Sequence, residues 1–358
     1  MLPPNGLIKW SRPDRSDRSG KAAPVRGCVH HVVIMDGTLS SLDVGHETNA
    51  GRVYRLLSDV VPKRQINVYY EAGIQWQGWR RASDVIAGRG INRQIRRAYG
   101  FLASRYHPGD RIYLLGYSRG AYAVRSLAGI IDRIGLLTSD HATMRNVTTA
   151  YRHYQHSPGT EAARSFATAH CHPGVAVEMI GVWDTVKALG LRLPLLWMLT
   201  EPKYSFHNHQ LGPMILHGFQ ALALHETRSA FRPVLWNSPE PDDGRIEQVW
   251  FRGAHGDIGG QLGDFERARP LANIPLCWML EKAEQCGLPL PDGWRDRFPC
   301  NPEAPMMGTW TNWGKLFLLR RRRHVGMDKS ETLHPSALRP VAPRWFAPAL
   351  PGLGRRVP

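Results

Sequence analysis

One serine of this sequence lies between two glycines, in a setting that would make it a nucleophile. Gly116-Tyr117-Ser118-Arg119-Gly120 follows an apolar run and precedes an alanine-rich segment with helical spacing. A nucleophilic serine sits on a tight, strained turn between a strand and a helix, and glycines two residues away leave room for that turn. The pattern therefore predicts acyl transfer, with Ser118 as the nucleophile. The alternative is a serine that only caps the helix.

A serine of this kind needs a base, and the base needs a carboxylate that orients it. Asp184 stands near the end of one apolar run, and His255 near the end of another. Their order after Ser118 is the order of nucleophile, acid and histidine in α/β-hydrolases. We therefore expect a triad of Ser118, Asp184 and His255. Asp257 is the alternative acid, although a carboxylate two residues from the histidine rarely reaches the far ring nitrogen. It would otherwise hold the glycine-rich loop that follows the histidine.

Acyl transfer also needs donors for the oxyanion of the tetrahedral intermediate. The first expected donor is the backbone N–H of Arg119, directly after the nucleophile. The second is expected from Gly37 or Thr38, in a loop where a glycine lets the backbone approach a substrate closely. Asp36, which precedes them, is expected to hold that loop. The predicted chemistry needs no metal and no organic cofactor, and the five cysteines show no metal-ligand spacing.

These residues have to meet at one edge of a sheet. Apolar β-branched runs predict strands, and apolar residues three and four apart predict helices. The predicted strands are 30–38, 65–73, 111–117, 175–186 and 247–257, and the predicted helices are 49–60, 83–106 and 121–135. Apolar strands that alternate with helices indicate an α/β fold, a mainly parallel sheet with helices on both faces. The candidate triad and Asp36 then fall at the carboxyl ends of strands, where such sheets bind ligands.

Several stretches, taken in order, resemble one known family. They are MDGTLSS, YYEAGI, LLGYSRGAYAVRSLAG, EMIGVWDTVKALG, ALALHETRSAFRPVLW and VWFRGAHGDIGGQ, and they span roughly residues 30–265. In these blocks the sequence is similar to the α/β-hydrolase domain associated with phospholipase effectors of type VI secretion. The resemblance implies an α/β-hydrolase-like fold and a hydrolase that acts on lipid esters. It also implies Ser118 as the nucleophile, Asp184 as the acid and His255 as the base.

The formal net charge of +16 indicates an anionic partner. Near the C-terminus, Arg320-Arg321-Arg322-Arg323 follows the apolar stretch Leu316–Leu319. This combination suits peripheral contact with an anionic membrane, and a solvated face beside the core is the alternative. No helix-turn-helix, zinc-finger or RNA-binding signature accompanies the charge, so a nucleic-acid partner is not expected. The sequence predicts no oligomeric state.

The composition changes at both ends of the chain. Residues 1–27 are rich in Pro, Gly and charge, and they predict a flexible arm without an apolar leader. The hydrolase domain is expected over 28–290, and a Pro-, Arg- and Trp-rich extension over 291–358 is expected to pack on it. The apolar segment 188–200 is either a lid or a core helix. The expected location is the cytoplasm. Export by a secretion system that does not cleave a leader is left open.

Two functions are compatible with this sequence. The first is a serine hydrolase that cleaves carboxylic ester bonds, above all of lipids or phospholipids, through an acyl-enzyme. The second is a non-catalytic basic adaptor that uses the same fold to bind a membrane or a protein. The order of the triad residues favours the first.

Overall fold

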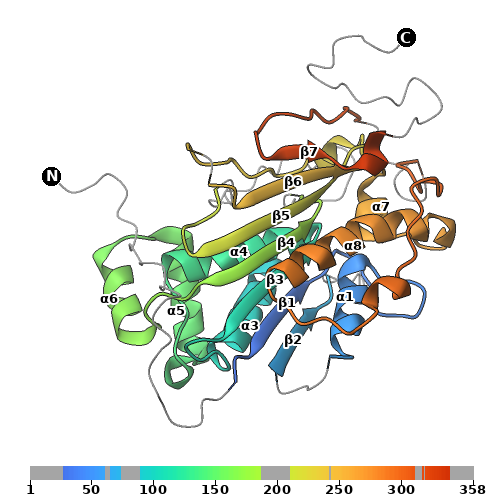
Figure 1. Ribbon diagram of the computed structural model, residues 1–358. Coiled ribbons are helices and arrows are strands. Elements are labelled where there is room, and N and C mark those ends of the chain that lie inside the picture. Colours follow the sequence, from blue (N-terminus) through green and yellow to red (C-terminus); the bar gives the residue numbers. More distant parts are fainter. Residues whose placement is uncertain are drawn as a thin grey trace, which may run out of the picture.

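A parallel sheet forms the centre of the protein (Figure 1). The computed structural model describes residues 27–60, 65–73, 89–186, 210–241, 243–310, 317 and 319–338. Within these residues the sheet has seven strands in the order β2-β1-β3-β4-β5-β6-β7, and every neighbouring pair is parallel. The strands are β1 His30–Met35, β2 Ile66–Glu71, β3 Arg111–Tyr117, β4 Val177–Trp183, β5 Ile215–Ala223, β6 Ile246–Phe251 and β7 Glu331–Leu333.

Helices cover both faces of this sheet (Figure 1). One face carries α3 (Arg89–Ala103), α4 (Arg119–Arg133), α5 (Met144–His156) and α6 (Glu161–His170). The other face carries α1 (Asn49–Leu57), α7 (His255–Gly259) and α8 (Arg269–Gln285). Short 3₁₀ helices lie in the connections: η3 Ser139–His141, η5 Ser229–Phe231, η6 Glu266–Ala268, η7 Trp294–Arg297 and η9 Pro335–Leu338.

The side chains of β3 show why the strand is apolar on both sides. Successive residues of a strand point to opposite faces of the sheet. Ile112 and Leu114 join the hydrophobic core under α3 and α4, while Tyr113 and Leu115 join the core under α1 and α8. Because both faces are covered, a central strand of this sheet has to be apolar throughout, which is the pattern read from the sequence.

Threonines fix the starts of three helices. Thr48, Thr143 and Thr160 precede α1, α5 and α6, and each hydroxyl accepts a hydrogen bond from a backbone amide of the first turn. Such a cap is worth about 1 kcal/mol. The hydroxyl of Thr48 has a second role, because it also donates to the carboxylate of Asp36 (2.6 Å). The start of α1 is thereby tied to the loop after β1.

The expected α/β fold, with a mainly parallel sheet and helices on both faces, is confirmed. The predicted strand list is incomplete, since it lacks β5 and β7. His217, Gly218 and Gln220 interrupt the apolar run of β5, and β7 is only three residues long. The predicted strand 247–257 is wrong beyond Phe251, because β6 ends there and α7 begins at His255.

Several predictions concern segments that are only partly described. The segment 188–200 and the first 26 residues of the predicted arm lie outside the described residues. Within the predicted extension, β7 pairs with β6 and continues the sheet. The division into arm, domain and extension stays a prediction. Among the helices that the structure describes, none has the length and apolarity needed to cross a bilayer.

Candidate active site

The turn between β3 and α4 holds Ser118 in a strained backbone conformation. Its φ of 58° and ψ of −119° fall in a region that L-residues seldom adopt. The glycines on either side are required by close packing. A Cβ on Gly120 would lie 2.1 Å from the carbonyl oxygen of Met35, and one on Gly116 would lie 2.7 Å from the Cα of Ala121. The G-x-S-x-G pattern thus corresponds to a strand–turn–helix junction with no room for larger residues.

Gly120→Ala should destabilise the fold, because the added methyl group would meet backbone atoms that cannot rotate away. We expect a loss of roughly 3 kcal/mol in the free energy of unfolding, measured by denaturant titration. Gly100→Ala on α3 is the matched control, since its Cβ would approach only Val147, at 3.8 Å. Alanine there should be neutral or stabilising by up to about 1 kcal/mol. Equal stability of the two variants would contradict the steric account.

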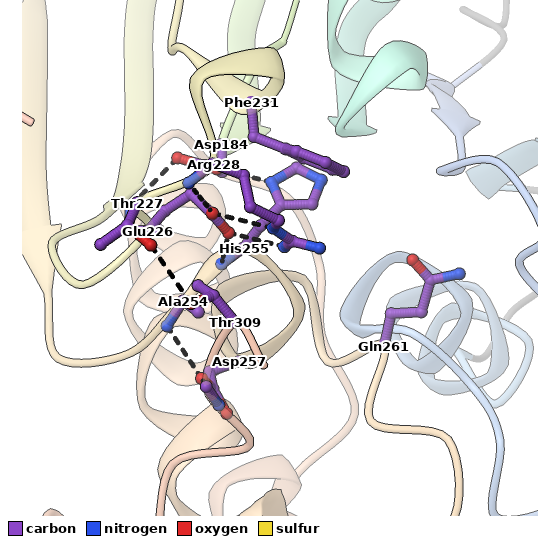
Figure 2. Close-up of polar contacts among 12 residues, drawn as sticks. Asp184, Glu226, Thr227, Arg228, Phe231, Ala254, His255, Asp257, Gln261 and Thr309 are labelled. Carbon is purple, nitrogen blue, oxygen red and sulfur yellow. Dashed lines mark hydrogen bonds and ion pairs between the residues drawn. The ribbon is translucent and has the colours of Figure 1, made fainter. Parts of the chain in front are cut away.

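The structure brings the three predicted triad side chains together. The Nε2 atom of His255 lies 2.8 Å from the Oγ atom of Ser118, and its Nδ1 atom lies 2.5 Å from Oδ2 of Asp184. All three residues are buried. Ser118 follows β3 and Asp184 follows β4, whereas His255 is the first residue of α7 and not, as expected, the end of a strand. Figure 2 shows His255 beside Asp184.

Asp184 is surrounded by hydrogen-bond donors. Besides His255, the guanidinium of Arg323 donates from Nη1 to Oδ1 (2.5 Å) and from Nη2 to Oδ2 (2.9 Å), and the amide of Ala223 donates to Oδ1 (3.1 Å). Burial alone would raise the pKa of Asp184. The charge of Arg323 and the hydrogen bonds from His255 and Arg323 outweigh burial and hold this pKa well below its usual value. Asp184 is therefore an anion.

His255 is poised as a neutral base. Burial lowers its pKa below the usual value, Asp184 and Glu226 act in the opposite direction, and Arg228 adds to the lowering. In a neutral imidazole that donates from Nδ1 to Asp184, the lone pair is on Nε2. That lone pair can accept the proton of the Ser118 hydroxyl.

Aromatic rings and an ion pair fix the position of the imidazole. The rings of Tyr117 and Phe231 lie 5.0 and 4.9 Å from that of His255, measured between centroids. Glu226 accepts a hydrogen bond from the backbone N–H of His255 (3.2 Å) and forms an ion pair with Arg228 (2.6 Å). The Arg228 guanidinium in turn lies 4.0 Å from the centroid of the Phe231 ring. Figure 2 shows Phe231, Glu226 and Arg228 around the histidine.

Asp257 holds the turn before α7. Its carboxylate accepts hydrogen bonds from the backbone amides of Ala254 (2.8 Å), Met307 (2.7 Å) and Gly308 (3.4 Å). Burial raises the pKa of Asp257 to about 6 against the effect of these bonds. The structure therefore places Asp184 on the imidazole and Asp257 on the backbone of the turn (Figure 2).

The loop after β1 adjoins the nucleophile. A Cβ on Gly37 would lie only 3.4 Å from the Cβ of Ser118. The amide of Gly37, however, donates to Oδ1 of Asp36 (2.6 Å). Of the two donors predicted in this loop, Gly37 is thus disfavoured and Thr38 is the candidate that is left. Arg119 begins α4 directly after the nucleophile, as predicted. The oxyanion-binding role of Thr38 and Arg119 stays a prediction.

Asp36 fastens this loop to its surroundings. Its carboxylate accepts from the amide of Gly37, from the hydroxyl of Thr48 (2.6 Å) and from the phenol of Tyr70 (2.6 Å). Burial raises the pKa of Asp36 to about 6, although each of these hydrogen bonds lowers it. Asp36 thus contacts the loop, the start of α1 and β2. Its supporting role in the site stays a prediction.

Three charged residues around the triad were not expected from the sequence: Glu226, Arg228 and Arg323. Arg323 belongs to an arginine run that we interpreted as a membrane-facing or solvated surface, and for this residue the interpretation is wrong, because it is only 7% exposed. Glu226 and Arg228 lie in ALALHETR, a stretch that carried the family resemblance. An ion pair between residues two apart matches neither the spacing of helix pairs nor that of cross-strand pairs. The sequence alone therefore does not predict it.

The converging groups define what the site can do. A hydroxyl, an imidazole and a carboxylate follow one another by hydrogen bonds. Such a chain can deprotonate a serine and transfer an acyl group. Within the described ranges, no cluster of His, Cys, Asp or Glu side chains could hold a metal ion. Fold and site together are those of an α/β-hydrolase-like protein with a Ser-His-Asp arrangement.

Comparison with known families is in agreement with this class. The chain belongs to the family described as T6SS, phospholipase effector Tle1-like, catalytic domain, whose model matches residues 30–282, well over half of the chain. The family resemblance read from the sequence is thereby confirmed. The matched range contains Ser118, Asp184 and His255 and ends before Arg323.

Individual relatives are distant. The uncharacterized protein YEL023C of Saccharomyces cerevisiae is 27% identical over 236 residues, which are 59% of this chain and 33% of that protein. A structure of the Tle1 effector bound to the VgrG spike of the type 6 secretion system is similar with a TM-score of 0.38 and 19% identity, over 71% of this chain and 56% of that one. An uncharacterized protein from Pseudomonas aeruginosa gives a TM-score of 0.46 and 16% identity, over 76% and 49%. The chain thus spans about a third of the length of the curated relative.

Proposed function

We propose that this protein is a serine hydrolase that cleaves carboxylic ester bonds of lipids, above all phospholipids, through an acyl-enzyme. The observation that carries the proposal is the hydrogen-bonded chain from Ser118 through His255 to Asp184. The strained turn that presents Ser118 supports it, because strain of this kind is concentrated at functional sites. Membership of a phospholipase effector family supports a lipid substrate.

The first half of the proposed reaction forms the acyl-enzyme. Nε2 of His255 takes the proton of Ser118 as Oγ attacks the ester carbonyl carbon. Asp184 holds Nδ1–H in place and stabilises the imidazolium that results. The backbone amides of Arg119 and Thr38 are the proposed donors to the oxyanion. His255 then gives its proton to the leaving alcohol oxygen, and the ester bond breaks.

The second half repeats these proton transfers with water. His255 takes a proton from a water molecule, whose oxygen attacks the acyl carbon. The tetrahedral intermediate collapses, the bond between the acyl carbon and Ser118 Oγ breaks, and the proton returns from His255 to the serine. The product is a free carboxylic acid.

A serine-directed fluorophosphonate probe tests this proposal. The folded protein should become labelled, heat-denatured protein should not, and peptide mass spectrometry should place the adduct on Ser118. A panel of phosphatidylcholine, phosphatidylethanolamine, phosphatidylglycerol and triacylglycerol, assayed for released fatty acid, would then identify the lipid. Folded protein that resists the probe and releases no fatty acid from any of them would overturn the proposal and favour the basic adaptor.

We further propose that a surface patch beside the site contacts an anionic membrane. The patch consists of Leu319 (45% exposed), the exposed Arg321 and Arg322, and Trp310 (51% exposed), whose ring centroid lies 3.6 Å from the guanidinium of Arg320. Backbone hydrogen bonds from Ser229 to Leu319 and from Arg321 to Thr227 join it to the loop that leads to Phe231. Apolar side chains beside arginines suit the surface of an anionic bilayer.

Arg321→Gln/Arg322→Gln should weaken binding to vesicles that contain phosphatidylglycerol. Each cation near such a surface contributes about 1 kcal/mol, so the loss is expected to be about fivefold per arginine at low salt. Co-sedimentation with vesicles of increasing phosphatidylglycerol content measures it. Arg145→Gln/Arg164→Gln, which removes the same charge from exposed positions on α5 and α6, is the control. Equal weakening by both double variants would show that only the net charge matters.

Membership of this family also supports a proposal for where the protein acts. We propose that the chain is made in the cytoplasm and that a type VI secretion apparatus can export it to reach a target membrane. A tagged chain should then appear in the medium only when the apparatus is intact. Release that does not depend on the apparatus would contradict export by this route.

A further inference from the structure

Residues 319–338 lie beyond the part of the chain that the family model matches, and one of their side chains contacts the triad. Arg323 extends its guanidinium to Asp184, where both carboxylate oxygens accept from it. The same guanidinium donates to the backbone carbonyls of Ala223 (2.9 Å) and Phe231. Arg323 therefore links three things: the acid of the triad, the end of β5, and the 3₁₀ turn whose Phe231 ring packs on His255.

The backbone on both sides of Arg323 is fixed. Before it, Leu319 and Arg321 are hydrogen-bonded to Ser229 and Thr227 in an antiparallel arrangement. After it, β7 pairs with β6 and completes the edge of the sheet. The side chain is also buried, with 7% of the residue exposed. The neighbours of Arg323 therefore hold its guanidinium against Asp184.

We infer that Arg323 is a positioning residue of the active site, which fixes the carboxylate of Asp184 and, through it, the orientation of His255. The C-terminal segment is on this account part of the catalytic unit. The inference rests on the proposed function, since it assigns Arg323 a part in that reaction. Two parallel N–H to oxygen bonds allow only one orientation of the carboxylate plane, which a single charge would not do.

The charge of Arg323 should also appear in the pH dependence of the reaction. Among the described residues, the titratable groups that face His255 are Asp184 directly after β4, Tyr117 on β3, and the pair Glu226 and Arg228 in the loop after β5. Arg323 offsets part of the negative charge of Asp184. Without it the imidazolium would be better stabilised, so His255 would stay protonated to a higher pH. The acidic limb of kcat/KM should therefore move upward, by about one pH unit.

The experiment compares Arg323→Met and Arg323→Lys with the full-length wild type, on a soluble p-nitrophenyl ester and with the fluorophosphonate probe. For Arg323→Met we expect roughly a hundredfold loss of kcat/KM and the upward shift of the acidic limb. Arg323→Lys keeps the charge without the paired donors. It should lose about tenfold in kcat while its acidic limb stays near that of the wild type.

Arg245→Met is the matched control. Arg245 is also mostly buried and hydrogen-bonded, to the carbonyls of Gly212 and Ile215, but it precedes β6 and so lies at the amino end of that strand. Because it lies at the end of the strands opposite to the triad, its loss should lower stability without moving the pH profile. If Arg323→Met does not fold, Arg323→Lys alone decides the question. A lower kcat with an unchanged acidic limb would then support the positioning role.

The outcomes separate the two proposals. Wild type that neither reacts with the probe nor cleaves the ester would refute the hydrolase itself. Wild type that does both, with Arg323 variants of unchanged kcat and pH profile, would refute the role of Arg323 and leave the hydrolase intact. A uniform loss in the Arg323 and Arg245 variants that follows the folded fraction would reduce Arg323 to a structural residue.

Discussion

Ser118→Ala is expected to lower kcat/KM for ester hydrolysis by about a millionfold, to a level set by substrate binding alone. The hydroxyl is the group that the Nε2 atom of His255 contacts, at 2.8 Å, so its removal takes away the atom proposed to attack the ester. The fold should persist, because alanine fits the same turn and the main cost is one buried hydrogen bond, about 1 kcal/mol. Steady-state kinetics and circular dichroism measure the two effects.

Two further variants make this result specific. Ser104→Ala removes an exposed serine hydroxyl at the end of α3 and should keep full turnover. Ser118→Ala/His255→Ala should lose no more activity than Ser118→Ala, since the two residues act as one unit. An additive loss in the double variant, or turnover of Ser118→Ala close to that of the wild type, would show that the chemistry lies elsewhere.

The residues of the candidate active site could be predicted from the sequence because their positions follow rules that are local in the chain. The turn at Ser118 needs small neighbours, and glycine is the residue that the packing at 116 and 120 allows. Asp184 and His255 follow apolar runs that form parallel strands, and parallel strands bring their carboxyl ends to one edge. The order of the residues then selects the triad.

What could not be read depends on contacts between distant segments. β5 was not predicted because Gln220 is buried inside it, where it is hydrogen-bonded to Thr185 and Val234. A polar residue thus occupies a position at which the pattern of a buried strand requires an apolar residue. The engaged amide of Gly37 depends on the rotamer of Asp36, which the sequence does not specify. Arg323 lies far from Asp184 along the chain, and no feature of the sequence distinguishes it from the three arginines that precede it.

Asp184→Asn is expected to lower kcat/KM by about four orders of magnitude, because the partners of this carboxylate among the described residues are donors. The Oδ2 position faces His255 and Arg323, and the Oδ1 position faces Ala223 and Arg323. An amide NH₂ in the first position would turn the imidazole to its other tautomer, with the proton on Nε2 and no lone pair for Ser118. At the Oδ1 position, the NH₂ group would face the N–H donors of Ala223 and Arg323.

The same substitution should also destabilise the protein, by about 3–5 kcal/mol, since it leaves the buried charge of Arg323 uncompensated. Asp184→Asn/Arg323→Met should therefore regain part of the free energy of unfolding while turnover stays lost. Asp132→Asn, which changes a largely buried acid on α4 that accepts from the amide of Met214, is the control for removing a carboxylate as such. Chemical denaturation and kcat/KM of the four proteins separate the contributions. Turnover in Asp184→Asn within tenfold of the wild type would mean that His255 keeps its tautomer without this acid, and the proposed role of Asp184 would then be wrong.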